Sequence, residues 1–187
     1  AKEHAILQNL DTSFQKIDEL PFDFERRRMS VIVKDDSNVV SMVTKGALEE
    51  MLTISTHVEY RGEIIPITEG IRQEVLAEVG QLNRQGLRVL GVGYKSGLRE
   101  DYAYAVTDES DMILTGYLAF LDPPKPSAAP AIQALLEHGV KTKILTGDNE
   151  KVTQAICEKV GLDVEHILLG ADIDQMTDQE LAEVVER

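Results

Sequence analysis

The five residues Asp122-Pro123-Pro124-Lys125-Pro126 constrain the fold of this sequence more than any other stretch. Each proline fixes φ and removes a backbone donor, so neither a helix nor a sheet ladder can continue through the run. Such a run forms a stiff connector. We therefore expect a domain over residues 1–121 and a second one that begins at residue 122 and continues to residue 187, with the proline run as the connector.

Short β-rich runs dominate the segment before the prolines. Residues 31–33 and 39–44 flank the turn-forming residues 34–38, which predicts an antiparallel hairpin. Residues 58–67 have Gly62 near their centre and predict a second hairpin, in which Pro66 favours an edge position.

Helical spacing appears at two places in the same segment. Residues 2–10 have apolar side chains at roughly helical intervals, and Phe14, Ile17 and Leu20 continue the pattern. Residues 71–82 predict an amphipathic helix that ends at Gly86. The parts that follow are expected to be a strand over 87–94, a solvated acidic loop over 100–111 and a strand over 112–121.

The segment after the prolines alternates between helix and strand patterns. Residues 128–137 predict a helix closed by Gly139, residues 140–145 a strand, and residues 152–160 a second helix. This alternation is typical of a parallel α/β unit, whose strands carry polar residues at their carboxyl ends. Here those residues are Thr146, Gly147, Asp148 and Asn149.

Composition excludes several classes of function. The net charge of −14 argues against a nucleic-acid partner, which requires a continuous basic face. The sole cysteine, Cys157, has the spacing of a core thiol, and the absence of a disulfide framework fits a reducing compartment. The four histidines are scattered without metal-ligand spacing, and no apolar run approaches the ~18 residues of a membrane span.

The stretch from Pro21 to Ser30, P-F-D-F-E-R-R-R-M-S, joins two aromatic residues to three consecutive arginines. Adjacent positive charges repel one another, so an anionic group is expected to compensate them. One interpretation is a loop whose charges protect an edge strand from pairing with other chains. The other is a nucleotide site, because Phe22 or Phe24 offers a face to a base and the arginines offer charge to phosphates.

Three further residues are candidates for the same site. Lys45 and Gly46 follow a strand and precede a helical pattern, where a lysine suits a phosphate or an adenine edge and a glycine permits close approach of a ligand. An ordinary strand-to-helix turn would have the same residues. Arg88 lies in an apolar strand and must be paired there, either with an acidic side chain or with a phosphate.

The segments FDFERRRMS, TKGA, GLRVL, DPPK and ILTGDN occur in this order. Each is weak alone, but together they make the chain similar to the nucleotide-binding part of a P-type cation-transporting ATPase over essentially its whole length. The first segment most resembles bacterial magnesium-transporting members. The resemblance implies an α+β fold, with an antiparallel sheet flanked by helices over residues 1–121, followed by the hinge and a partial α/β phosphorylation domain over 122–187.

The resemblance also implies an ATP site, with ATP and Mg²⁺ present as Mg-ATP. Phe22 would stack on adenine, Arg27 would lie near the nucleotide, Lys45 with Gly46 would border the adenine pocket, and Arg88 would reach toward the phosphates. In the parent pump the γ-phosphate would approach Thr146, Gly147 and Asp148. Phe24 departs from the pattern, since calcium pumps of the family have a basic residue there.

The DKTGT, GDGxND and TGE motifs of the family are absent from these 187 residues. The resemblance therefore implies a chain that binds ATP but does not turn it over alone, because the phosphorylated aspartate lies elsewhere. Its partners would be the remaining phosphorylation, actuator and transmembrane domains of a magnesium pump. The chain would lie on the cytoplasmic side of a bacterial inner membrane, without membrane contact of its own.

Two other classes of protein compete with this interpretation. A haloacid-dehalogenase-type phosphatase needs an Asp-x-Asp nucleophile after a strand, whereas Asp11-Thr12-Ser13 follows no predicted strand and lacks the second aspartate. A non-catalytic acidic interaction module would account for the charge, but it leaves the arginines and Lys45 unexplained.

Overall fold

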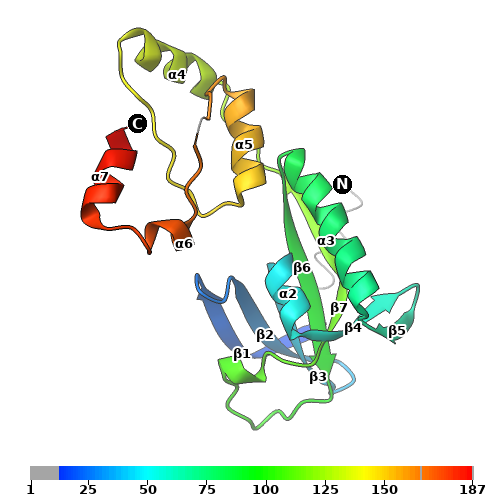
Figure 1. The fold of residues 1–187 in the computed structure, drawn as a ribbon. Coiled ribbons are helices and arrows are strands. Elements are labelled where there is room, and N and C mark those ends of the chain that lie inside the picture. Colours follow the sequence, from blue (N-terminus) through cyan, green and yellow to red (C-terminus); the bar gives the residue numbers. More distant parts are fainter. Residues whose placement is uncertain (1–12, 165, 187) are drawn as a thin grey trace. The chain divides into compact units, whose positions relative to one another are not determined.

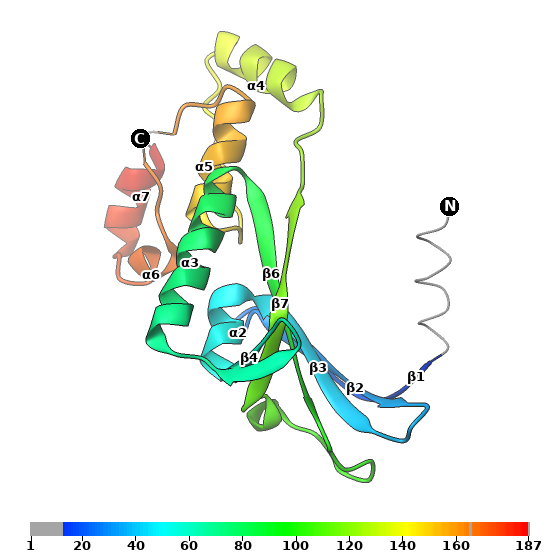
Figure 2. The same cartoon turned by 90° about the vertical axis from the view of Figure 1, so that its right-hand side faces the viewer.

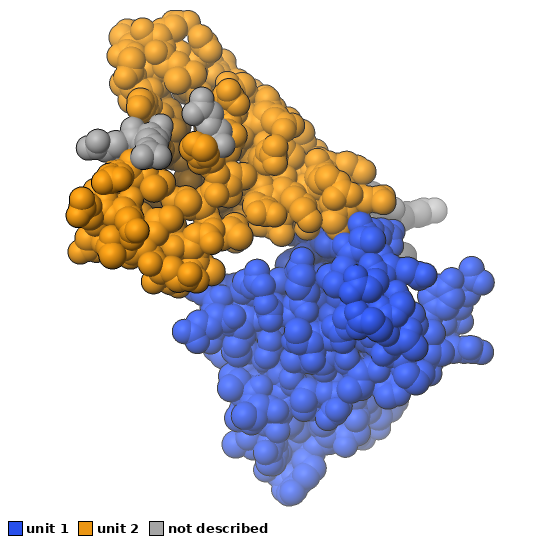
Figure 3. Space-filling model, viewed as in Figure 1, with its two compact units in different colours: residues 1–79, 89–120 blue, residues 80–88, 121–187 orange. Residues whose placement is uncertain are grey.

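The computed structural model of the chain describes residues 13–164 and 166–186 (Figure 1). The helix expected over residues 2–10 and the pair Asp11 and Thr12 lie outside the described residues. The chain divides into two compact units, residues 1–79 with 89–120 and residues 80–88 with 121–187 (Figure 3).

A single sheet forms most of the first unit. Among the described residues it has seven strands in the order β1-β2-β3-β6-β7-β4-β5. Their bounds are β1 (Phe14–Asp23), β2 (Arg28–Asp35), β3 (Val40–Ala47), β4 (Ser55–Tyr60), β5 (Glu63–Pro66), β6 (Leu87–Ser96) and β7 (Met112–Leu121). The expected α+β fold with a sheet flanked by helices is confirmed, and within the mostly antiparallel ladder β4 pairs with β7 in parallel.

Helices α2 (Leu48–Ile54) and α3 (Glu69–Arg84) lie on the same side of β6 and β7 (Figure 2). They share a core with strand residues: Leu48, Met51 and Leu52 come from α2, Val79 from α3 and Leu114 from β7. A second core lies among the other strands and consists of Leu20, Ile32, Val40, Met42 and Met112. A short 3₁₀ helix, η1 (Val106–Asp108), precedes β7.

Both predicted hairpins are confirmed. The first joins β2 to β3, and the second joins β4 to β5 through Arg61 and Gly62. These two turn residues have φ of 53° and 83°, as a two-residue hairpin turn with left-handed central residues requires. Strand β5, which ends with Pro66, lies at the edge of the sheet as expected. Helix α3 is also as predicted, with Gly86 at φ 81° after its end.

The helical pattern expected to continue through Phe14, Ile17 and Leu20 is wrong, because these residues lie on β1. The register of β1 against β2 shifts between Lys16 and Asp18 and again between Leu20 and Asp23. Such irregularities insert extra residues into a strand. Apolar side chains three positions apart can therefore lie on one face of a strand, which imitates a helical period.

The second unit contains helices α4 (Ala128–Glu137), α5 (Glu150–Lys159), α6 (Gly170–Ile173) and α7 (Asp178–Glu186). The strand expected over residues 140–145 does not form. A parallel strand needs backbone hydrogen bonds from neighbouring strands. The described residues after β7 form no strand, so residues 140–145 have no partner for such bonds. The side chain of Leu145 is accordingly 96% exposed.

Helix α5 supplies the buried part of this unit. The side chain of Asn149 caps its start by accepting a hydrogen bond from the Lys151 amide at 2.9 Å. Val152, Ala155 and Cys157 are buried on its inner face. Cys157 is thus a core thiol, as predicted, and burial raises the pKa of that thiol. In the part of the chain that the structure describes, no helix is both long and apolar enough to cross a membrane.

Candidate functional site

The arginine-rich stretch forms the turn between β1 and β2. Strand β1 ends at Asp23 and β2 begins at Arg28, so residues 24–27 make the turn and Phe22 lies on a strand. Arg27 has φ of 48°, in the left-handed region, and its amide donates to the Asp23 carbonyl at 2.7 Å. Because of this turn, the side chains of Arg26, Arg27 and Arg28 do not all point the same way.

Arg26 and Arg28 point to one buried carboxylate, that of Glu109. The Glu109 Oε2 atom accepts from Arg26 Nη1 at 2.6 Å and from Arg28 Nε at 2.8 Å. Burial by itself raises the pKa of Glu109, but hydrogen bonds from Arg26, Ser30 and Arg28 outweigh it and hold the pKa below its usual range. The anion that compensates two of the arginines is therefore a side chain of this protein.

A hydroxyl pair anchors the same carboxylate to the sheet. Ser30 Oγ donates to Glu109 Oε1 at 2.7 Å and lies 2.7 Å from Thr44 Oγ1, and both hydroxyls are fully buried. Glu109 is itself 3% exposed, so the expectation of a solvated loop over residues 100–111 is wrong at this position. Its partners lie about eighty residues away in sequence, and no local pattern identifies it.

Arg27 has a different environment from its neighbours. Its Nη2 atom lies 2.5 Å from Glu50 Oε1 of α2, and its side chain is about half exposed. A pair this accessible is weak, because water screens both charges. The guanidinium could therefore exchange Glu50 for another anion.

The two aromatic residues of the stretch form a pair at the surface. Phe22 is 51% exposed and Phe24 is 87% exposed. Their ring centroids lie 5.2 Å apart with an interplanar angle of 87°, which is an edge-to-face arrangement. At least one ring face is consequently available to a planar ligand.

Lys45 and Gly46 lie near the end of β3, just before α2. The Lys45 side chain is exposed and has no hydrogen bond or ion pair with another described residue, while its backbone lies in the sheet between β2 and β6. Gly46 packs against the arginine turn: a Cβ added there would lie 2.4 Å from Arg28 Cβ and 2.7 Å from the Arg27 carbonyl oxygen. The structure thus gives Gly46 a packing role, while Lys45 keeps a free charge.

The register of the strands places Phe22 and Lys45 at the same end of the sheet. Asp23 of β1 pairs with Arg28 of β2, and Arg28 pairs with Gly46 of β3. Phe22 and Lys45 each precede a member of this paired set, so both lie beside the arginine turn. Since one strand lies between theirs, their backbones are about 10 Å apart.

Arg88, Thr146, Gly147 and Asp148 all belong to the second unit. Arg88 Nη2 lies 2.8 Å from Asp148 Oδ2 and 3.5 Å from Asp122 Oδ2. The Thr146 hydroxyl accepts from the Asp148 amide at 3.0 Å, and Gly147 has open space around its Cα. Of the two interpretations of Arg88, the salt bridge is the one formed here.

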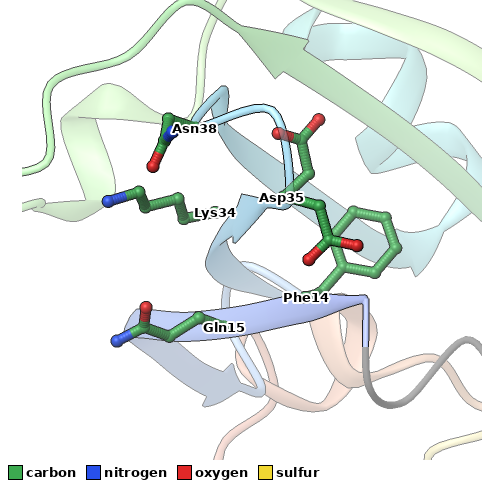
Figure 4. A pocket seen from close by; sticks show the side chains of 6 residues that line it. Phe14, Gln15, Lys34, Asp35 and Asn38 are labelled. Carbon is green, nitrogen blue, oxygen red and sulfur yellow. The ribbon is translucent and has the colours of Figure 1, made fainter.

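A cleft of about 330 Å³ lies at the other end of β1 and β2 (Figure 4). It is lined by Phe14, Gln15, Lys34, Asp35, Asp36 and Asn38. The Asp35 carboxylate is already used there, because it accepts from the Ser37 and Val39 amides. Among the described residues, no group of three or more His, Cys, Asp and Glu side chains could hold a metal. The predicted nucleotide residues Phe22, Arg27 and Lys45 do not line this cleft and lie at the other end of the strands.

The sequence model of the family described as "P-type ATPase, cytoplasmic domain N" matches residues 2–127, more than half of the chain. The chain belongs to this P-type ATPase family. The motif order had predicted this membership, and the match confirms it.

Individual P-type ATPases are similar over nearly the whole chain. "Magnesium-transporting ATPase, P-type 1" of Salmonella typhimurium strain LT2 is 48% identical over 180 residues, which are 96% of this chain and 20% of that protein. The protein of the same name from Escherichia coli K12 is 46% identical, with the same coverage. "Calcium-transporting ATPase 1" of Bacillus cereus is 31% identical over 95% of the chain and 20% of its own length. The chain spans about a fifth of the length of these relatives.

Proposed function

We propose that the chain is the ATP-binding cytoplasmic portion of a magnesium-transporting P-type ATPase of a bacterial inner membrane. The observation that carries the ATP site is the pair of Phe22 and Lys45, an exposed ring and a free ammonium at the same end of β1 and β3, with β2 between them. Magnesium is supported by the identity of 43–48% to magnesium-transporting relatives, against 30–34% to calcium-transporting ones.

Each residue of the proposed site has a chemical task. The ring of Phe22 stacks on adenine, and Lys45 donates to the base or to a phosphate while Gly46 keeps the turn close to β3. Arg27 exchanges Glu50 for the nucleotide, and Arg88 likewise exchanges Asp148 for a phosphate. Phe24 closes the other side of the ring.

In this proposal residues 1–121 form the nucleotide-binding domain, and residues 122–187 form the hinge and part of the phosphorylation domain. ATP, accompanied by Mg²⁺, supplies the phosphoryl group that an aspartate outside these 187 residues accepts. Thr146, Gly147 and Asp148 would lie near the γ-phosphate in the parent pump. The remaining phosphorylation, actuator and transmembrane domains are the partners, and the chain alone does not hydrolyse ATP.

Titration of the chain with ATP, followed by NMR chemical shifts, tests the ATP site. We expect weak, saturable binding with shift changes around Phe22 and Lys45. Phe22→Ala should weaken binding by about 1–3 kcal/mol through lost stacking. Lys45→Ala should weaken it by about 1.5–3 kcal/mol through a lost charged hydrogen bond.

Phe14→Ala is the matched control, because Phe14 is 50% exposed and lies at the opposite end of the same strand. That variant should bind ATP as the wild type does. If Phe22→Ala and Lys45→Ala also leave the affinity unchanged, adenine binds elsewhere on the chain.

A further inference from the structure

The buried carboxylate of Glu109 is connected to both sides of Phe22 through a single arginine. Arg26 donates from Nη1 to Glu109 at 2.6 Å and from Nη2 to the Pro21 carbonyl at 2.7 Å. Its Nε atom lies 3.4 Å from Asp23 Oδ2. We infer that Glu109 is a positioning residue for nucleotide binding, which fixes the ring of Phe22 by way of Arg26.

The geometry of the guanidinium explains why one arginine can do this. Its nitrogen atoms form a rigid planar fork, so fixing one edge fixes the directions of the others. Pro21 and Asp23 are the residues immediately before and after Phe22. With both neighbours held by the same planar group, the backbone at Phe22 has little freedom to rotate, so the Cα–Cβ bond that carries the exposed ring has a defined direction.

The carboxylate that holds Arg26 is itself immobile. Ser30 and Thr44 connect it to β2 and β3, and its side chain has no exposed surface. Arg28 adds a second charged hydrogen bond from the first residue of β2. The turn is thus attached to the buried interior of the first unit, whereas the rings of Phe22 and Phe24 remain exposed to a ligand.

Stability alone is a weaker explanation for this network. A buried ion pair has a large desolvation cost and often contributes little net free energy compared with apolar residues of the same size. Holding a binding residue in its bound conformation, in contrast, lowers the ordering cost of association. The connection to both neighbours of Phe22 fits the second effect.

The inference rests on the proposed ATP site, and Glu109→Gln tests it. This variant keeps the shape of the side chain but removes its charge and places an amide donor toward a donor-rich pocket. We expect the ATP dissociation constant to rise about tenfold, which corresponds to about 1.4 kcal/mol. Without ATP, the ring signals of Phe22 should shift and lose their single well-defined environment.

Glu100→Gln is the matched control, since Glu100 pairs with Lys34 at the surface, outside this network. It should change neither the ATP affinity nor the Phe22 signals. Arg26→Gln should resemble Glu109→Gln, and the double variant should be no worse than either single one, because both act through one connection.

The possible results separate the inference from the proposed function. If Glu109→Gln lowers stability but leaves the Phe22 signals and the ATP affinity at wild-type values, Glu109 is merely structural and the inference is wrong. If the wild type does not bind ATP, the proposed function fails, and the Phe22 signals of the ligand-free variants still decide whether Glu109 positions the ring. If Glu109→Gln does not fold, Arg26→Lys removes the fork but keeps the charge, and unchanged Phe22 signals in that variant would overturn the inference.

Discussion

The two units of this chain bury their apolar residues to very different extents. In the first unit, Leu48, Met51 and Leu52 of α2 are almost completely buried between helices and strands. In the second, burial is concentrated on α5 and the residue after it, and large apolar side chains elsewhere remain accessible, among them Leu135, Leu136, Val140, Ile144 and Leu145.

This difference in burial follows from whether each unit contains a sheet for its helices to cover. The first unit assembles its sheet from hairpins and two crossovers, β3 to β4 through α2 and β5 to β6 through α3, so its helices have a surface to cover. Helices of an α/β unit bury their apolar faces on parallel strands. No strand forms over residues 140–145, so the described helices of the second unit lack such a surface. The first unit therefore has cores enclosed between helices and strands, whereas the second buries apolar residues mainly along one helix.

Truncating one leucine in each unit gives the largest contrast. Leu52 is 1% exposed and Leu145 is 96% exposed. Leu52→Ala should lower the free energy of unfolding of the first unit by about 2–5 kcal/mol, whereas Leu145→Ala should change stability by less than about 0.5 kcal/mol. Urea denaturation followed by NMR signals from each unit measures both effects, and similar losses in the two variants would contradict the comparison.

Gly46→Ala should have the next largest effect. The added methyl would meet the backbone of the arginine turn, which cannot move aside as a flexible side chain would. Overpacking of this kind costs about 1–3 kcal/mol. The loss should appear in the unfolding free energy even without ATP, and a Gly46→Ala protein that is fully stable but binds ATP poorly would show that this glycine serves the ligand instead.

The charge network of the first unit should give it a distinctive acid response. Because the pKa of Glu109 is lower in the folded state than its ordinary value of 4.5, its stabilising contribution is present above that value and is lost as the pH falls through the folded-state pKa. The unfolding free energy of the wild type should therefore fall more steeply on acidification than that of Glu109→Gln. Parallel pH profiles for the two proteins would exclude this contribution.

The ion pair in the second unit should matter least for stability. Arg88 and Asp148 are partly exposed, and pairs of this kind contribute about 0–1 kcal/mol. Asp148→Asn should change the hydrogen exchange of α5 amides only slightly, and Asp122→Asn less, because Asp122 is farther from Arg88 at 3.5 Å. A larger loss in either variant would mean that this unit depends on its surface charges.

Local patterns in the sequence predicted most of the first unit. The hairpin turns, the glycine after α3 and the edge proline at residue 66 act within a few neighbouring residues, so they are visible without the fold. Strand β1 was mistaken for a helix because its register shifts replace the alternating pattern by a spacing of three. The strand expected over residues 140–145 failed for the opposite reason, since its pattern is right but its neighbours are lacking.

Phe22 and Lys45 could be chosen as candidate site residues from the sequence, because they lie in motifs that occur in the family's order. Their roles remain predictions. The sequence did not predict that Arg26 and Arg28 pair with Glu109 whereas Arg27 pairs with Glu50. These pairings depend on a left-handed residue at the turn and on Glu109, which lies more than eighty residues from Arg26 in an acidic segment of ordinary composition. Long-range charge pairing of this kind has no signature in a single sequence.

The position of β7 in the sheet has a consequence for how the chain is made. The β4–β5 hairpin leaves the ribosome well before β7, yet in the sheet it is attached to the other strands through β7. Until synthesis passes Leu121, the hairpin has no sheet neighbour and the core around Leu114 is incomplete. The first unit therefore cannot finish folding as its early strands emerge, and the nascent chain must wait for the strand that leads directly into the proline-rich residues 122–126.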